Sequence, residues 1–89
     1  MIKVRFATKF KKQHKKVDNK IQKAFDLRLA MFLENPDNPV LNNHALIGEY
    51  KGCRSINING DWRAIYSQYS DDEIVFEVIG THSQLYKKR

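Results

Sequence analysis

The chain has one cysteine, two prolines and four glycines among its 89 residues, and it contains no long hydrophobic run. A single cysteine cannot form an intramolecular disulfide, so a small secreted scaffold held by disulfides is excluded. A membrane-spanning helix needs about 20 predominantly apolar residues, and no segment offers them. The first residues alternate apolar and charged side chains and do not resemble a signal peptide. We therefore expect a cytoplasmic protein that has no membrane partner.

Residues that could hold a metal or a cofactor are also few. His14, His44 and His82 are not spaced as ligands on one helix or in a zinc ribbon. The glycines are scattered rather than gathered in a phosphate-binding loop. Cys53 has no evident base beside it and is expected to be a small apolar residue in or beside a strand. The sequence thus predicts no metal site and no cofactor, and it predicts that His14 lies on a helix surface.

Charge is abundant and unevenly distributed. The formal net charge is +6, with nine basic residues and one acid between positions 1 and 23, and four acids between positions 71 and 77. Such a basic region attracts phosphate backbones or an acidic protein. A solvated helix face would explain the same cluster, so charge favours a nucleic-acid partner without establishing one.

The N-terminal half predicts one strand followed by two helices. Alternating apolar residues over positions 2–6 indicate the strand, and Thr8 is expected to cap the first, lysine-rich helix. A second helix is expected to start at Asp18 or Asn19 and to stop at Asn35-Pro36, because proline resists helix. Its apolar side chains recur at helical spacing: Ile21, Phe25, Leu29 and Phe32.

The C-terminal half reads as strands. Alternation begins near Cys53, Asn59-Gly60 predicts a two-residue hairpin turn, and residues 70–72 predict a second turn before an apolar strand over 74–79. The element order is β-α-α-β-β-β. We expect one α+β domain over residues 1–89, in which a helical hairpin packs on a small antiparallel sheet.

Polar residues gather along these strands. Residues two apart on a strand share a face. Ser55, Asn57 and Arg63 are therefore expected on the face turned away from the helices, with Asp61 left open as a fourth member, and we expect this face to be polar and solvent-facing. The full set of candidates is His44, Lys51, Arg54, Ser55, Asn57, Asp61, Arg63, His82 and Tyr86.

Such a set is suited to cleaving RNA through the substrate's own 2′-hydroxyl. That reaction needs a base, an acid and positive charge at the phosphate. Histidine titrates nearest neutral pH, arginine holds phosphate through a planar fork, and Tyr86 could stack on a base or donate a proton. The opposite possibility is that an antiparallel sheet simply has a polar outer face.

Three segments resemble toxins of the RelE/ParE superfamily, and within it the YafQ-like subgroup. They match the patterns H-x-L-x-G-x-x-x-G-x-R from His44, D-W-x-x-I-Y from Asp61 and G-T-H-x-x-L-[FY] from Gly80. The resemblance implies a RelE-like fold and metal-independent, ribosome-dependent cleavage of messenger RNA. It also implies an acidic antitoxin partner, together with ribosomal RNA contacts made through the basic helices.

The resemblance also implies roles for individual residues. His44, Asp61 and His82 match the subgroup's acid–base residues, and Tyr86 matches its C-terminal aromatic residue. Arg63 matches the strand arginine that RelE-like and HigB-like relatives use at the phosphate, although YafQ-like sequences have an apolar residue there. Lys51, Arg54 and Asn57 are the expected RNA or phosphate ligands.

One departure bears on the chemistry. YafQ-like sequences carry a histidine where this chain has Asn57, and asparagine does not transfer a proton at neutral pH. We therefore expect His44 and His82 to form the acid–base pair, in an order that the sequence leaves open. Asp61 is expected to orient a histidine or the ribose, or else only to shape its hairpin.

Two other functions remain compatible with the same fold. ParE-like relatives inhibit DNA gyrase by binding, without catalysis, and a degenerate nucleic-acid-binding member is also conceivable. The joint presence of His44, Asp61 and His82 favours the ribonuclease over both, because function depends on the site rather than on the fold.

Overall fold

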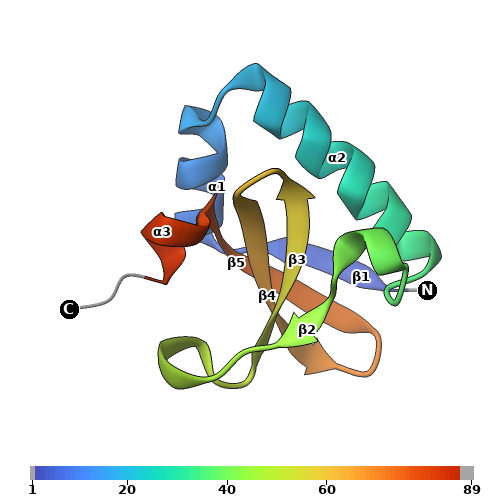
Figure 1. Ribbon diagram of the computed structural model, residues 1–89. Helices are drawn as coiled ribbons and strands as arrows, with labels where there is room; N and C mark the ends of the chain where they lie inside the picture. The colour runs from blue at the N-terminus through green and yellow to red at the C-terminus, as the bar shows by residue number, and fades with distance from the viewer. Residues whose placement is uncertain (1, 87–89) are drawn as a thin grey trace.

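The computed structural model describes residues 2–86 as a five-stranded sheet with two helices packed across one face (Figure 1). Its elements are β1 (Lys3–Phe6), α1 (Thr8–Lys16), α2 (Asn19–Glu34), the 3-10 helix η1 (Pro39–Leu41), β2 (His44–Ala45), the 3-10 helix η2 (Gly48–Tyr50), β3 (Cys53–Asn59), β4 (Trp62–Ser70), β5 (Glu73–Thr81) and α3 (His82–Leu85). The predicted α+β class, with its helical hairpin on the sheet, is confirmed. The short elements β2, η1, η2 and α3 were not predicted.

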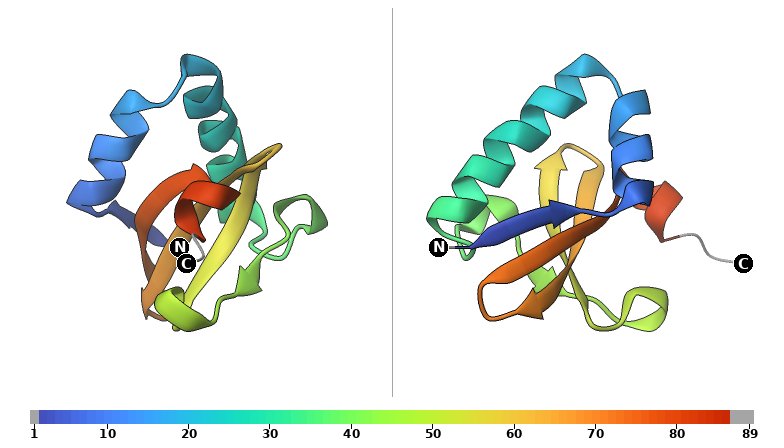
Figure 2. Two further views of the ribbon diagram at one scale, coloured as in Figure 1. Left: turned by 60° about the vertical axis from the view of Figure 1, so that its left-hand side comes forward. Right: turned by 180° about the vertical axis from the view of Figure 1, so that it is seen from behind.

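The sheet has the strand order β1-β5-β4-β3-β2. Its β2–β3, β3–β4 and β4–β5 pairs are antiparallel, whereas β1 pairs in parallel with β5, Val4 lying opposite Ile74. The helical hairpin follows β1 and lies across one face of the sheet, so β1 and β5 pair although they are far apart in sequence (Figure 2). The sheet is therefore mostly antiparallel rather than wholly so.

Helix boundaries follow local chemistry, with one correction. The Asp18 carboxylate accepts a hydrogen bond from the Lys20 amide at 2.9 Å, so Asp18 caps α2 as expected. α2 ends at Glu34, just before Pro36, also as expected. The prediction that Thr8 caps α1 is wrong: Ala7 occupies the cap position and no side chain caps the helix. The Ala7 amide instead donates to the Phe76 carbonyl at 2.9 Å, which extends the contact of β1 with β5.

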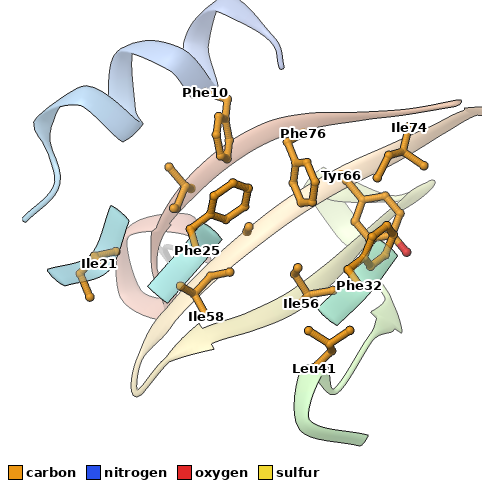
Figure 3. Packing of buried hydrophobic residues seen from close by; sticks show 12 residues of the cluster. Phe10, Ile21, Phe25, Phe32, Leu41, Ile56, Ile58, Tyr66, Ile74 and Phe76 are labelled. Atoms are coloured by element: carbon orange, nitrogen blue, oxygen red, sulfur yellow. The ribbon is translucent and has the colours of Figure 1, made fainter. Parts of the chain in front are cut away.

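Aromatic side chains form the centre of the core between the helices and the sheet (Figure 3). The Phe25 ring lies 5.2 Å from both the Phe10 and the Phe76 ring, and Phe32 meets Tyr66 edge-on at 5.1 Å. Each such side chain contributes about 1.5–3 kcal/mol through burial, and the ring pairs add somewhat more. This face of the sheet, the helix face, therefore provides most of the packing.

His14 lies at the edge of that core. Its ring stacks on Phe10 at 5.8 Å and meets Phe25 edge-on at 5.7 Å. It is half-buried rather than free on the helix surface. Its position explains the residue as part of the packing between α1 and α2.

The loop between α2 and β2 is anchored by one buried leucine. Asn38 caps η1 by accepting from the Val40 amide at 3.0 Å, and Leu41 is completely buried beneath it. Asn42 follows with φ +47°, a left-handed conformation that asparagine tolerates better than most residues. This anchor fixes where β2, and with it His44, begins.

No helix within residues 2–86 is both long enough and apolar enough to cross a membrane.

Replacing Leu41 with alanine should remove that anchor. We expect Leu41→Ala to lower the free energy of unfolding by about 2–5 kcal/mol, as buried leucines generally do. The measurement is urea denaturation followed by circular dichroism. Leu27→Ala is the matched control, because Leu27 is 71% exposed on α2 and should cost under about 0.5 kcal/mol. Equal losses in the two variants would contradict the anchoring role.

Candidate active site

The strand register places His44 on the face of the sheet turned away from the helices, which we call the outer face. His44 is paired with Ser55, Ser55 with Ile65, and Ile65 with Val78. Directly opposed residues in antiparallel strands project to the same face. His44 therefore begins a cross-strand row that runs over β3, β4 and β5.

A second row lies two residues further along the strands. Asn57 is paired with Arg63, and Arg63 with Gly80. The expectation that Asn57 and Arg63 share a face is confirmed. Gly80 has no side chain, so the helix that follows β5 can pack directly against the backbone at this end of the row.

The hairpin between β3 and β4 is what brings Asn57 opposite Arg63. The predicted Asn59-Gly60 turn would have paired Asn57 with Trp62. The structure instead turns at Gly60 and Asp61, pairs Asn59 with Trp62, and contains a bulge between Asn57 and Asn59. Gly60 adopts φ +52°, a conformation that glycine accepts without strain. The turn prediction is thus displaced by one residue, and the bulge restores the facing of the two polar residues.

The outer face is less polar than predicted. Ile65, Val78 and Leu85 form a second buried cluster there, with Leu46, Tyr50, Cys53 and Tyr86 packed against it. Ser55 is completely buried within the sheet on this side, and its hydroxyl has no hydrogen-bond partner among the described residues. The expectation of a polar, solvent-facing face is therefore wrong for its central part, because α3 and the β2–β3 connection cover it.

Helix α3 is short, and it is stabilised by the capping residue that precedes it and by its packing against the sheet. The Thr81 hydroxyl accepts from the Gln84 amide at 3.2 Å, while the Gln84 side chain accepts from the Thr81 amide at 2.9 Å. This reciprocal arrangement is a capping box. Leu85 is buried against the sheet, and a Cβ at Gly80 would lie only 3.1 Å from its Cδ2 atom. The G-T-H-x-x-L segment is therefore a structural device that presents His82 and Tyr86.

Four of the predicted site residues line one open groove of about 440 Å³ on the outer face, which we call the histidine groove. It is lined by His44, Arg63, His82 and Tyr86 together with Asn42, Ala45, Leu46 and Ile47. They come from β2, β4, α3 and the loops beside β2, segments far apart in sequence. Fold and register thus bring two imidazoles and one guanidinium to a single surface.

The His44 ring is held by the backbone two residues before it. Its Nδ1 atom lies 2.8 Å from the Asn42 carbonyl oxygen. Since a carbonyl only accepts, Nδ1 carries the proton and the neutral ring has its free lone pair on Nε2.

The Arg63 guanidinium is partly engaged by the hairpin. Its Nη1 donates to the Gly60 carbonyl at 2.8 Å and to the Trp62 carbonyl at 3.0 Å. Those bonds fix the plane of the group. The donors on Nε and Nη2 form no hydrogen bond with any residue that the structure describes, so they can serve an anion in the groove.

His82 and Tyr86 form an aromatic pair along one side of α3. Their ring centroids lie 4.7 Å apart, and Tyr86 also meets Tyr50 edge-on at 6.1 Å. The Tyr86 hydroxyl is buried without a partner in the described part of the chain. The His82 amide donates to the Asp61 carbonyl at 2.9 Å, so the hairpin turn also holds the start of α3.

The remaining predicted residues lie outside the groove lining. Asp61 is exposed in the hairpin turn and reaches His82 only through its backbone carbonyl. Lys51 is exposed in the turn before β3. Asn57 lies beside Arg63 in the second row, where its Oδ1 atom is buried and has no hydrogen-bond partner within residues 2–86.

Arg54 points to the helix face, opposite Asn57. Its Nε donates to the Asn43 side chain at 2.8 Å, and Asn43 in turn donates to the Tyr66 hydroxyl at 2.8 Å. This network ties the chain just before His44 to β3 and β4. In this structure Arg54 therefore helps to position β2. The phosphate role expected for it stays a prediction.

Sequence reasoning missed several residues that shape the groove. Thr81 and Gln84 form a capping box whose T-x-x-Q spacing is visible in the sequence. Asn42 supplies the carbonyl that orients His44, and no pattern marks it. Ile47 lines the rim of the groove although it is 89% exposed, which an unpatterned loop does not reveal.

Two ionisable groups of the second cluster have perturbed pKa values. Burial raises the pKa of the Cys53 thiol, and the negative charge of Glu77 adds to the effect. Burial likewise raises the pKa of Tyr50, with the charge of Glu49 contributing. Both groups stay neutral near pH 7, which fits the expectation that Cys53 is a small, half-buried strand residue.

No group of three or more His, Cys, Asp or Glu side chains within residues 2–86 is arranged to hold a metal ion.

A sequence model of the family described as "Bacterial toxin of type II toxin-antitoxin system, YafQ" matches residues 2–87. The chain belongs to this family. A Haemophilus influenzae protein that carries the name toxin YafQ is 42% identical over 52 residues, which cover 55% of this chain and 49% of the relative. The match therefore spans about half the length of that curated relative.

Solved structures of YafQ toxins share the whole fold. YafQ from E. coli strain BL21(DE3) superposes with a TM-score of 0.80 at 23% identity, covering 97% of this chain and 99% of that one. YafQ in the E. coli DinJ-YafQ complex gives a TM-score of 0.69 at 26% identity over the same shares. A YoeB/ParE toxin from Agrobacterium tumefaciens gives 0.74 at 14% identity, covering 91% and 99%, and shows the fold alone. The suspected membership of the RelE/ParE superfamily, with YafQ as the subgroup, is confirmed.

The packing of α3 in this YafQ-family chain depends on Gly80. An alanine there would place its Cβ 3.0 Å from Gln84 Oε1 and 3.1 Å from Leu85 Cδ2. We expect Gly80→Ala to displace α3 and to cost about 1–3 kcal/mol of stability. Amide hydrogen exchange at Tyr86, whose N–H donates to the His82 carbonyl, should accelerate. Ser83→Ala, at an exposed position of the same helix, is the control. Unchanged exchange in Gly80→Ala would show that α3 does not depend on this contact.

The Cys53 thiol should be unreactive while the protein is folded. A raised pKa leaves less thiolate at any given pH, and the thiolate is the reacting species. At pH 8 we expect Ellman's reagent to modify folded Cys53 roughly tenfold or more slowly than the same residue in guanidinium chloride. Glutathione under both conditions controls for the effect of denaturant on the reagent. Equal rates in folded and unfolded protein would disprove the burial effect.

Proposed function

We propose that this toxin is a ribosome-dependent endoribonuclease that cleaves messenger RNA by attack of the 2′-hydroxyl on the adjacent phosphate. The observation that supports it is the histidine groove, an open surface lined by two imidazoles and one guanidinium. The mechanism uses protein side chains alone. The general base, the general acid and the ligand of the phosphate are then three different residues.

His44 is the general base in this proposal. The Asn42 carbonyl holds the proton on Nδ1, so Nε2 is free to accept the proton of the 2′-hydroxyl. The resulting alkoxide oxygen forms a bond to phosphorus. Because His44 is exposed at the edge of the sheet, a flexible strand can reach it without a change of fold.

His82 is the general acid. As the new O2′–P bond forms, the P–O5′ bond breaks and the imidazolium of His82 gives its proton to O5′. The products are a 2′,3′-cyclic phosphate and a 5′-hydroxyl, so no water is consumed in this step. The Asp61 carbonyl and the Thr81 capping box fix the start of α3, which positions the acid with little freedom.

Arg63 stabilises the charge that develops on the non-bridging phosphate oxygens. Its Nη1 group is held by the hairpin carbonyls, which leaves Nε and Nη2 to point a planar pair of donors at the phosphate. Asn57, next to it in the row, can donate its amide hydrogens to phosphate or ribose, and Tyr86 gives the base a surface to stack on. Asp61 acts through its backbone carbonyl, which accepts from the His82 amide and holds the start of α3.

Partners follow from family membership and charge. The E. coli relative is found in a DinJ-YafQ complex, and we propose that an acidic antitoxin covers this chain in the same sense. The net charge of +6 favours both that partner and the RNA of the ribosome. The cytoplasm, where ribosomes are, is the proposed location.

Induction of the chain in cells should stop translation and cut a reporter transcript within codons. Primer extension maps the cuts, and a transcript without a ribosome-binding site should remain intact. His82→Ala and Arg63→Ala should each reduce cleavage by roughly 100-fold or more, the scale expected for loss of a proton donor or of charge stabilisation. Ser83→Ala and Arg5→Ala are the matched controls, since both positions are exposed and lie outside the groove lining.

The chemistry has its own readout. A messenger with a 2′-deoxy nucleotide at the mapped position should resist cleavage there, and the downstream fragment should carry a 5′-hydroxyl that polynucleotide kinase labels directly. Full activity of His82→Ala and Arg63→Ala would refute the assigned site. Intact transcripts together with a DNA-damage response would instead indicate a ParE-like action on gyrase.

A further inference from the structure

Helix α1 carries a concentration of like charge that the fold does not neutralise. Five of its nine residues are lysine and none is acidic. None of them forms an ion pair within residues 2–86, where the ion pair found joins Arg5 and Glu73. Like charges three or four residues apart destabilise a helix by about 0.2–0.5 kcal/mol per pair. A nine-residue helix without a side-chain cap tolerates that cost poorly, so an external anion would relieve it.

The lysines of α1 fall on two sides of the helix. Lys9, Lys12 and Lys16 occupy positions i, i+3 and i+7 and line one shallow hollow together. Lys11 and Lys15 line a separate apolar groove between α1 and α2. We call the first set the lysine stripe.

The lysine stripe lies beside the histidine groove, with α3 between them. Lys9 and Lys16 line a hollow of about 490 Å³ whose other walls include Tyr50, Trp62 and Gln84. Helix α3 thus presents His82 and Tyr86 to the histidine groove and Gln84 to the hollow next to the stripe. Figure 1 and the right-hand view of Figure 2 show α3 next to α1, and residues of both helices line this hollow. Four residues of helix span about 6 Å, so a single strand can cross from one hollow to the other.

We propose that the lysine stripe binds the phosphate backbone of the RNA strand that is being cut, on one side of the cleavage position. The proposal rests on the ribonuclease function proposed above. Three ammonium groups along one helix side suit successive phosphates, and the rings of Tyr50 and Trp62 in the adjoining hollow offer stacking surfaces for bases. Asp18 is the one carboxylate in that hollow, and its side chain is engaged in capping α2. The continuity with the histidine groove favours the substrate strand over ribosomal RNA.

The test compares two charge-matched variants. The first carries Lys9→Gln, Lys12→Gln and Lys16→Gln, and the second carries Lys11→Gln, Lys15→Gln and Lys23→Gln. Both lose three positive charges from exposed positions on the helical layer. The probe is a fluorescein-labelled, single-stranded 2′-O-methyl RNA of about 12 nucleotides, which lacks the attacking hydroxyl. Fluorescence anisotropy gives Kd between 50 and 300 mM salt, and circular dichroism checks that each variant is folded.

We expect the stripe variant to lose affinity roughly tenfold or more at 100 mM salt and the other variant to change about threefold or less. The slope of log K against log salt should fall by about 2 in the stripe variant, since each phosphate contact on a single strand contributes about 0.7. Equal losses in the two variants would reduce the effect to net charge and overturn the proposal.

Two other outcomes would overturn it as well. Loss of ribosome binding with unchanged binding of the oligonucleotide would assign the stripe to ribosomal RNA. Loss of antitoxin binding alone would assign it to a protein partner. The probe cannot be cleaved, so its binding is measured independently of catalysis. If the lysine stripe binds the probe as expected but the toxin cuts no RNA, only the ribonuclease function is refuted, and the two failures can be told apart.

Discussion

The bulge between Asn57 and Asn59 is the constraint on which the outer face depends. In an antiparallel pair, a slip of one residue moves every side chain of a strand to the other face. Without the bulge, the Asn59–Trp62 pair would place Arg63 opposite Ile58 on the helix face and Ala64 opposite Asn57. The extra residue and the left-handed Gly60 leave β4 in the register where Arg63 and Ile65 point outward. The bulge thus decides that the positive charge of Arg63 lies in the histidine groove, although the bulge is distant in sequence from His44 and His82.

The sheet divides its two faces unequally, and that division explains where a site can form. The helix face holds the large aromatic cluster and is closed by α1 and α2. Within residues 2–86, the buried cluster of the outer face consists of Ile65 and Val78 from the sheet and Leu85 from the four-residue helix that covers them, together with a loop. Because few apolar side chains are buried on the outer face, polar residues and a groove can occupy it with little loss of packing energy. The packing on the helix face stabilises the sheet, so polar residues on the outer face can serve a functional site without being needed for stability.

Much of this arrangement could be predicted from local pattern, and the misses share one cause. The two long helices and the three long strands follow hydrophobic period, and Asp18 and Pro36 mark the ends of α2 as ordinary capping and breaking residues do. The parallel β1–β5 pair depends on contacts some 70 residues apart, which periodicity does not encode. The burial of Ser55 depends on α3 and on the β2–β3 connection, and the shifted turn after β3 depends on the bulge; tertiary packing decides both, whereas the shared face of Arg63 and Asn57 was predicted correctly. Arg54 was expected at a phosphate, and strand alternation already places it on the face opposite Ser55, but its bond to Asn43 could come only from the structure.

The mixture of rigid and irregular elements in the site fits the chemistry proposed for it. Arg63 stands on a central strand and is held by two carbonyls, as suits a group that must not move while charge develops on a phosphate. The two histidines lie at the edges of the fold instead, one on a two-residue strand and one at the start of a four-residue helix. The His44 ring is held by the Asn42 carbonyl. The His82 backbone is held by the Asp61 carbonyl, to which its amide donates, and by the Tyr86 amide, which donates to its carbonyl. With Asn57 at the position where the resemblance expects a histidine, no third imidazole stands on the rigid strands. In the proposed mechanism, proton transfer then falls to these two histidines, so Asn42, Asn43 and Gly80, which support the segments that carry them, should affect the cleavage rate through the position of each ring.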